Sequence, residues 1–244
     1  MARLDASART EFLPLPGGGR AALSIRRSRR ARRVALRIVP GSGEVELVVP
    51  QRGSIEEGIA FAREKAEWLK AHLNGMPPPV PFEDGAVIPI YGKPRRIRRT
   101  DELFSGTWLT ASELQVSAPP EIVGDYVRRW LRGEARKALL ELAEQKSRLV
   151  RRRFRRLTVR DTSSRWGSCS PSGDLSFSWR IVMGPRYALD YLVAHEVAHL
   201  VEMNHSPRFW AVVERIADDP ERGRDWLRDN GGALHRYGVA PRSL

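Results

Sequence analysis

Residues 194–210 read AHEVAHLVEMNHSPRFW and place two histidines and a glutamate in an otherwise apolar segment. The stretch ALDYLVAHEVAHLV at 188–201 is apolar around most of a helical circumference, which predicts a buried helix. Burying an ionised glutamate and two imidazoles without partners would cost several kcal/mol. A metal ion would supply both the charge and the bonds, so this segment predicts a metal site.

The spacing of the polar residues indicates zinc chemistry. His195 and His199 are four residues apart, so a helix places both rings on one face within reach of one ion. Glu196 lies too far round the helix to be an easy ligand, but it can contact a water on the metal. This H-E-x-x-H pattern predicts two Zn²⁺ ligands and a general base. Such a base takes a proton from the water and returns it to a leaving amine, so the predicted reaction is peptide-bond hydrolysis.

A catalytic zinc site needs a third protein ligand, and the chain offers two candidates. His205 lies in the predicted turn EMNHSP, in which Asn204 tolerates a left-handed backbone, so the chain can return this ring to the ion. Glu214 lies in the helix expected after Pro207 and is the competing ligand. We favour His205, because its own turn positions it.

Residues that could stabilise the developing oxyanion are less well defined by the sequence. Arg165 and Tyr237 are the candidates for this contact, and His235 is a further one. Each of these residue types also occurs as an ordinary surface or packing residue.

The first half of the chain has the pattern of a β-rich domain. VALRIV and EVELVV alternate apolar and polar residues on either side of PGSG, which predicts a hairpin. Ser54 is a predicted N-cap for one helix that ends at Gly75. We predict a flexible lead-in over residues 1–20, and a β-rich N-terminal domain with one helix over 21–119.

The second half, residues 120–244, is predicted to be the catalytic domain. A long amphipathic helix is expected within 121–154, since its apolar residues recur at helical spacing. Two strands joined around SPSGD are expected within 157–183. Pro185 then begins the helix with the two histidines, and Ser206-Pro207 begins the next.

Composition limits the class of protein. Lys and Arg total 42 against 29 Asp and Glu, a formal net charge of +13, which favours an anionic partner such as nucleic acid. The Arg-rich runs are RRSRRARR at 26–33 and RLVRRRFRRLTVR at 148–160, and the alternative is that they form solvated faces. A single cysteine excludes a disulfide framework, and no apolar run is long enough to predict a membrane span. The N-terminus lacks the pattern of a secretory signal, so we expect a cytoplasmic protein.

The three-part signature RWGSCS, HEVAH and NHSPRFW resembles that of the YgjP-like metallopeptidases, relatives of the SprT and WLM zinc proteases in the zincin group. The resemblance covers about residues 120–215. It implies an α+β fold, in which a compact zincin-like domain combines an active-site helix with a small antiparallel sheet beside a β-rich N-terminal domain. It implies His195, His199 and His205 as zinc ligands, Glu196 as the catalytic acid/base, and a protein or peptide substrate. SprT and WLM proteins are associated with cleaving proteins on DNA, which implies nucleic-acid-associated substrates.

The alternative hypothesis is a nucleic-acid-binding module whose zinc is purely structural. Arg-rich strips make salt-sensitive phosphate contacts without reading sequence. A structural zinc, however, prefers four closed ligands and has no use for a neighbouring general base such as Glu196. The sequence therefore favours a zinc metallopeptidase.

Overall fold

The structure is a computed structural model that describes residues 9–101 and 106–239 of the 244-residue chain. Contacts between residues divide the chain after Pro78 into an N-terminal unit and a C-terminal unit. The prolines at 77–79 connect the two units. They cannot continue the preceding helix, because proline has a fixed φ and no backbone N–H to donate.

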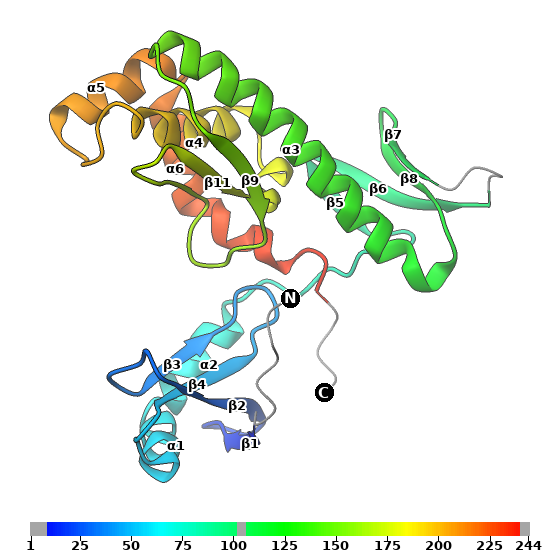
Figure 1. The fold of residues 1–244 in the computed structure, drawn as a ribbon. Helices are drawn as coiled ribbons and strands as arrows, with labels where there is room; N and C mark the ends of the chain where they lie inside the picture. The colour runs from blue at the N-terminus through cyan, green and yellow to red at the C-terminus, as the bar shows by residue number, and fades with distance from the viewer. Residues whose placement is uncertain (1–8, 102–105, 240–244) are drawn as a thin grey trace. The chain divides into compact units, whose positions relative to one another are not determined.

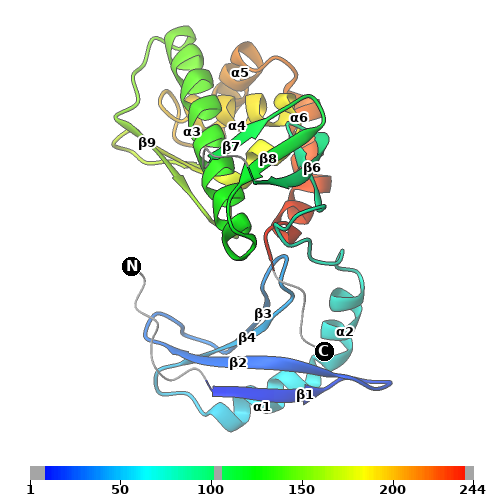
Figure 2. The same ribbon diagram turned by 90° about the vertical axis from the view of Figure 1, so that its right-hand side faces the viewer.

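The N-terminal unit is a small sheet with two helices on one face (Figure 2). Its elements are β1 (Arg9–Pro14), β2 (Arg20–Ser28), β3 (Ala35–Ile38), β4 (Val45–Pro50), α1 (Ile55–Glu64) and α2 (Ala66–Asn74). The strand order in the described residues is β1-β2-β4-β3, with β2 and β4 parallel and the outer pairs antiparallel. Leu23 and Leu47 of the sheet are buried in one core with Ala62 and Leu69 of the helices.

The predictions for this unit are confirmed in part. The predicted hairpin is the antiparallel pair β3–β4, and the Ser54 hydroxyl accepts the Glu57 N–H at 3.2 Å as the N-cap. The single predicted helix is wrong, because the backbone of Lys65 leaves helical geometry and divides it into α1 and α2. The flexible lead-in is also wrong from Arg9 onward. Residues 9–14 form β1, which buries Leu13 in the core, while residues 1–8 lie outside the described part of the chain.

The C-terminal unit begins with a second sheet and a long helix. Its first elements are β5 (Val87–Ile90), β6 (Lys93–Thr100), β7 (Gly106–Leu109), β8 (Glu113–Ser117), the 3-10 turn η1 (Pro120–Ile122) and α3 (Val123–Leu149). The described strands follow the order β5-β6-β8-β7. Figure 1 shows α3 running the length of this unit beside the sheet.

This sheet belongs to the C-terminal unit, so the predicted boundary between residues 119 and 120 is wrong. Ile97 and Leu114 of the sheet are buried in the same core as Val127 and Leu131 of α3. The two prolines at 119–120 only separate β8 from the helix. The apolar face of α3 is buried against this sheet, so the sheet and the helix belong to one unit.

The remaining elements surround the histidine helix. They are β9 (Arg156–Arg160), β10 (Gly167–Cys169), β11 (Asp174–Ser178), the 3-10 helix η2 (Trp179–Met183), α4 (Arg186–Ala198), α5 (Pro207–Ile216), α6 (Pro220–Asn230) and the 3-10 helix η3 (Gly231–Arg236). The two strands predicted around SPSGD are the antiparallel pair β10–β11. The described sheet has the order β10-β11-β9 and is mixed rather than antiparallel, because β9 joins β11 in parallel. The α+β fold class is confirmed. No helix in the described residues has the length and apolarity needed to cross a bilayer.

A buried ion pair fastens α4 to α3. Lys146 Nζ lies 2.5 Å from Asp190 Oδ1 and donates to the Ile216 carbonyl at 2.7 Å. Asp190 Oδ2 also accepts the Asp218 N–H at 2.8 Å. Both side chains are buried, so each charge depends on the other for its solvation. This pair places α4 relative to α3 and to the end of α5.

Candidate metal centre

Helix α4 is buried in the core, and its last turn carries the first of the three histidines. Almost every residue from Ala188 to Ala198 is buried, and α3 and α6 flank the helix. The regular helix ends at Ala198, so His195 lies in the last turn and His199 at the C-cap. The buried helix fixes the position of both rings.

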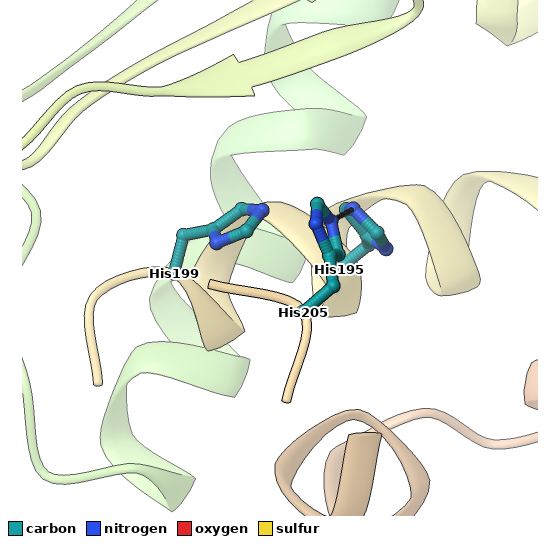
Figure 3. A group of neighbouring side chains, drawn as sticks. All are labelled: His195, His199 and His205. Carbon is teal, nitrogen blue, oxygen red and sulfur yellow. Dashed lines mark hydrogen bonds between the residues drawn. The ribbon is translucent and has the colours of Figure 1, made fainter. Parts of the chain in front are cut away.

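The structure brings the three predicted histidines together (Figure 3). One nitrogen from each of His195, His199 and His205 lies within 4.8 Å of the others. The ring centroids are 5.2 Å apart for His195 and His199, 5.1 Å for His195 and His205, and 4.9 Å for His199 and His205. Among the described residues, this is the group of His, Cys, Asp and Glu side chains with the geometry of a metal site.

The turn after α4 returns His205 to the helix. Asn204 Oδ1 accepts the Ser206 N–H at 3.1 Å, and the Ser206 hydroxyl accepts the Phe209 N–H at 3.4 Å as the N-cap of α5. Asn204 does not use the left-handed backbone that it tolerates, since among the described non-glycine residues only Tyr91 and Arg151 have positive φ. The Asn204 side chain makes the turn instead.

An aromatic ring from α5 lies against all three imidazoles. The Phe209 ring centroid is 4.9 Å from that of His195, 4.5 Å from His199 and 4.7 Å from His205, and its side chain is fully buried. Trp210 lies 5.8 Å from His195 and 5.9 Å from His205. These rings limit the orientations open to the histidines and keep water from one side of the cluster.

Burial favours the neutral imidazoles of His195 and His199, and the neutral ring is the state that binds a metal. Desolvation, followed by the nearby His199 and His205, lowers the pKa of His195 to about 4. Desolvation also lowers the pKa of His199, although its contact with Glu202 opposes this. His199 Nδ1 lies 3.1 Å from the Glu202 carbonyl, which can only accept, so Nδ1 carries the proton and Nε2 keeps its lone pair.

The nitrogen spacing fits a tetrahedral zinc ion. His205 Nε2 and His195 Nε2 are 3.1 Å apart. Two nitrogens that share one tetrahedral Zn²⁺ at 2.0–2.1 Å each would lie about 3.3 Å apart. The buried Nδ1 of His195 has no hydrogen-bond partner among the described residues. A cluster of three imidazole nitrogens suits a cation of borderline softness such as zinc.

Glu196 lies beside the cluster in an apolar environment. Its side chain is 5% exposed, and burial raises its pKa to about 7, while the positive charge of Arg165 opposes the rise. A carboxyl group with a pKa near neutrality can both accept and donate a proton at physiological pH. Of the three predicted oxyanion contacts, Arg165 therefore has an electrostatic influence on this carboxylate.

The edge strand β10 packs against the Glu196 side chain. A Cβ atom at Gly167 would lie 2.5 Å from Glu196 Oε1 and 2.7 Å from its Cγ, so only glycine leaves room for the carboxylate. β10 pairs with β11 on one side and ends the sheet on the other within the described chain. Glu196 therefore packs against one face of a strand whose second edge is unpaired in the described residues.

Several candidates from the sequence lie elsewhere. Tyr237 forms a bridge to Val80, and its carbonyl accepts from Arg180 at 2.7 Å, so these contacts hold it at another part of the fold. Glu214 is exposed on α5 and outside the cluster of possible ligands. His235 is buried and stacks on Trp166 at 5.2 Å, next to the start of β10.

Two neighbours of the site, Gly167 and Phe209, were not singled out from the sequence. Gly167 stands inside the RWGSCS segment, and a glycine within a strand is a weak signal of close approach by another group. Phe209 follows the Ser206-Pro207 helix start and looks like any apolar residue of an amphipathic helix. Their roles depend on contacts across the fold.

Comparisons with known proteins show the family of the chain. A family model described as "YgjP-like, metallopeptidase domain" matches residues 32–230. Among solved structures, the metallopeptidase zymogen of Pyrococcus abyssi abylysin is 21% identical, with a TM-score of 0.35, covering 41% of this chain and 99% of that one. No curated protein matches the chain.

Proposed function

Since the chain belongs to the YgjP-like metallopeptidase family, we propose that it is a zinc-dependent peptidase with His195, His199 and His205 as ligands and Glu196 as general base and acid. The observation that carries the proposal is the convergence of three imidazole nitrogens within 4.8 Å beside a buried carboxyl group. When bound, zinc supplies a Lewis acid that activates water and polarises a peptide carbonyl. We also propose that the protein is located in the cytoplasm.

The chain's own residues account for the proton transfers. Glu196 accepts a proton from the attacking water at its carboxylate and then donates that proton to the leaving amine. Its raised pKa of about 7 suits both roles. Arg165 is near enough to Glu196 to lower its pKa, and its positive charge would stabilise negative charge that develops on the carbonyl oxygen.

The edge of β10 suits an extended peptide substrate. A chain that pairs with this edge would add a strand to the sheet through backbone hydrogen bonds. Gly167 lies on this strand next to Glu196, so such a peptide would pass close to the carboxylate. The alternative of a purely structural zinc fits less well, because the described cluster has three ligands rather than four closed ones.

Zinc content and chelation test the proposal. We expect the purified chain to bind one Zn²⁺ per molecule and to cleave an unfolded substrate such as fluorescent casein. A chelator should remove the ion and abolish cleavage, and added zinc should restore both, because the ion activates the nucleophile. Metal content by mass spectrometry and casein fluorescence are the measurements. A zinc-loaded chain that cleaves neither casein nor a mixed peptide library would refute the peptidase proposal.

Two matched variants decide which residue is the third ligand. His205→Ala should lower zinc affinity by at least about 10-fold, since it removes a direct ligand. Glu214→Gln should leave it unchanged, because this side chain is exposed outside the cluster. The opposite result would restore Glu214 as the ligand.

Gly167→Ala should separate activity from folding. The added Cβ would displace the Glu196 carboxylate, and a misplacement of about 1 Å lowers activity by about 10²-fold. Casein cleavage and the urea midpoint are measured together, and we expect the midpoint to change little, since the three atoms nearest to the added Cβ all belong to the Glu196 side chain and none to the backbone. Gly232→Ala is the control, because nothing lies within 4 Å of its added Cβ. Equal activity in the two variants would show that the close approach of Gly167 has no role.

A further inference from the structure

Figure 1 shows the segment that leads from the C-terminal end of α3 back to β9. The side chains of this segment and of the last turns of α3 line a basic hollow. Its volume is about 610 Å³. It is lined by four guanidinium side chains, one carboxylate, a serine and an aromatic ring: Arg148, Arg151, Arg152, Arg153, Glu144, Ser147 and Phe154. We call this the arginine hollow.

The charge of the arginine hollow is largely uncompensated. Arg148 lies 3.9 Å from Glu144, whereas Arg151, Arg152 and Arg153 are exposed and have no ion pair among the described residues. The carbonyl groups at the end of α3 carry a partial negative charge that opposes anion binding. Three of them already accept the N–H groups of residues 150–152, and their partial charge is small beside several full positive charges.

The backbone of the hollow uses arginine where glycine is favoured. Arg152 N–H bonds the Ser147 carbonyl and Arg151 N–H bonds that of Arg148, which is the Schellman pattern of helix ends. The residue at the left-handed position of this pattern is usually glycine, but here it is Arg151, with φ of 53°. The chain therefore keeps a guanidinium at a position where its backbone is strained.

A buried hydroxyl in the hollow lacks a partner. Ser147 is 6% exposed, and its Oγ makes no hydrogen bond among the described residues. Unsatisfied buried polar groups are uncommon in folded proteins. An anionic oxygen at the base of the hollow would accept this hydroxyl proton.

We propose that the arginine hollow binds the phosphate backbone of single-stranded nucleic acid. Several unpaired guanidiniums exceed the charge of one phosphate group, so they suit a chain of phosphates. The Phe154 ring lines the same hollow, and basic grooves with an aromatic ring for base stacking are typical of single-strand binding. This site lies outside the histidine cluster, so its test does not depend on peptidase activity.

The test measures binding of the full chain to an oligodeoxythymidine of about 20 nucleotides. Binding is measured by fluorescence anisotropy at several salt concentrations. Replacing Arg151, Arg152 and Arg153 by Gln should weaken binding about 10-fold or more, and should reduce the log–log salt slope by about 2. The charge-matched control replaces the exposed Arg98, Arg224 and Arg228 by Gln, and we expect it to bind nearly as wild type. Absence of binding by wild type, or equal loss in both triple variants, would overturn the proposal.

Two single variants exclude misfolding as the cause. Arg151→Gly should raise the urea midpoint, because it relieves the backbone strain, and yet weaken binding and lower the slope by about 0.7. Phe154→Leu should weaken binding about 10-fold without changing the slope, and should not affect an abasic strand of equal length. Unchanged affinity in Arg151→Gly would overturn the proposal.

Competition with other anions tests whether nucleic acid is the ligand of the hollow. We expect millimolar inorganic phosphate to displace the oligonucleotide poorly, and vesicles of phosphatidylserine and phosphatidylcholine to bind no better to wild type than to the Gln triple variant of the hollow. Saturable binding of phosphate alone, or hollow-dependent binding of vesicles in place of the oligonucleotide, would replace nucleic acid as the ligand.

Discussion

Glu196→Gln should lower peptidase activity by at least about 10³-fold while the chain keeps its zinc and its fold. The amide has nearly the same size as the carboxyl group, so the space beside Gly167 stays filled. It cannot accept a proton from water at neutral pH, however, and its N–H protons are not acidic enough to be given to the leaving amine. Cleavage of fluorescent casein, zinc content and the urea midpoint are measured on the same preparation.

The control for this variant is Glu214→Gln, which removes a carboxylate from the exposed face of the neighbouring helix. We expect it to retain wild-type activity and zinc. If Glu196→Gln kept a tenth or more of the activity, Glu196 would not be the base. If it lost the zinc as well, this glutamate would contribute to the metal site itself.

Lys146→Met should destabilise the C-terminal unit by about 3–5 kcal/mol, the largest effect on stability that we expect. The substitution preserves apolar volume but leaves Asp190 as a buried carboxylate whose contact at 2.5 Å is lost. Tryptophan fluorescence during urea unfolding measures the effect, because six of the seven tryptophans lie after Pro78. Since α4 carries the histidines, zinc affinity should fall together with stability.

Two further variants separate charge burial from packing. Lys137 is exposed on the same helix, so Lys137→Met should change the free energy of unfolding by less than about 0.5 kcal/mol. Adding Asp190→Asn to Lys146→Met should recover at least half of the loss, because a neutral amide can still accept the Asp218 N–H. A Lys146→Met protein with wild-type stability would show that the buried pair contributes little.

Local patterns were reliable where they describe one element at a time. The hairpin at β3–β4, the long helix α3, and the helices that begin at Pro185 and Ser206-Pro207 all lie where their periodicity and capping residues placed them. α6 was not predicted, since its mostly polar sequence has little apolar periodicity. Assignments that depend on partners were weaker, as the misplaced boundary at residues 119–120 shows.

The sequence by itself determined the chemistry of the site: two histidines one helical turn apart, a glutamate beside the first, and a third histidine after a short turn. These depend on residue type and on spacing along one chain. The tertiary structure alone decided that His205 rather than Glu214 joins the cluster, that Arg165 and not Tyr237 acts on Glu196, and that Gly167 and Phe209 enclose the site. Each of these depends on how α4, α5 and β10 approach one another, and packing between distant segments leaves no periodic trace in the sequence.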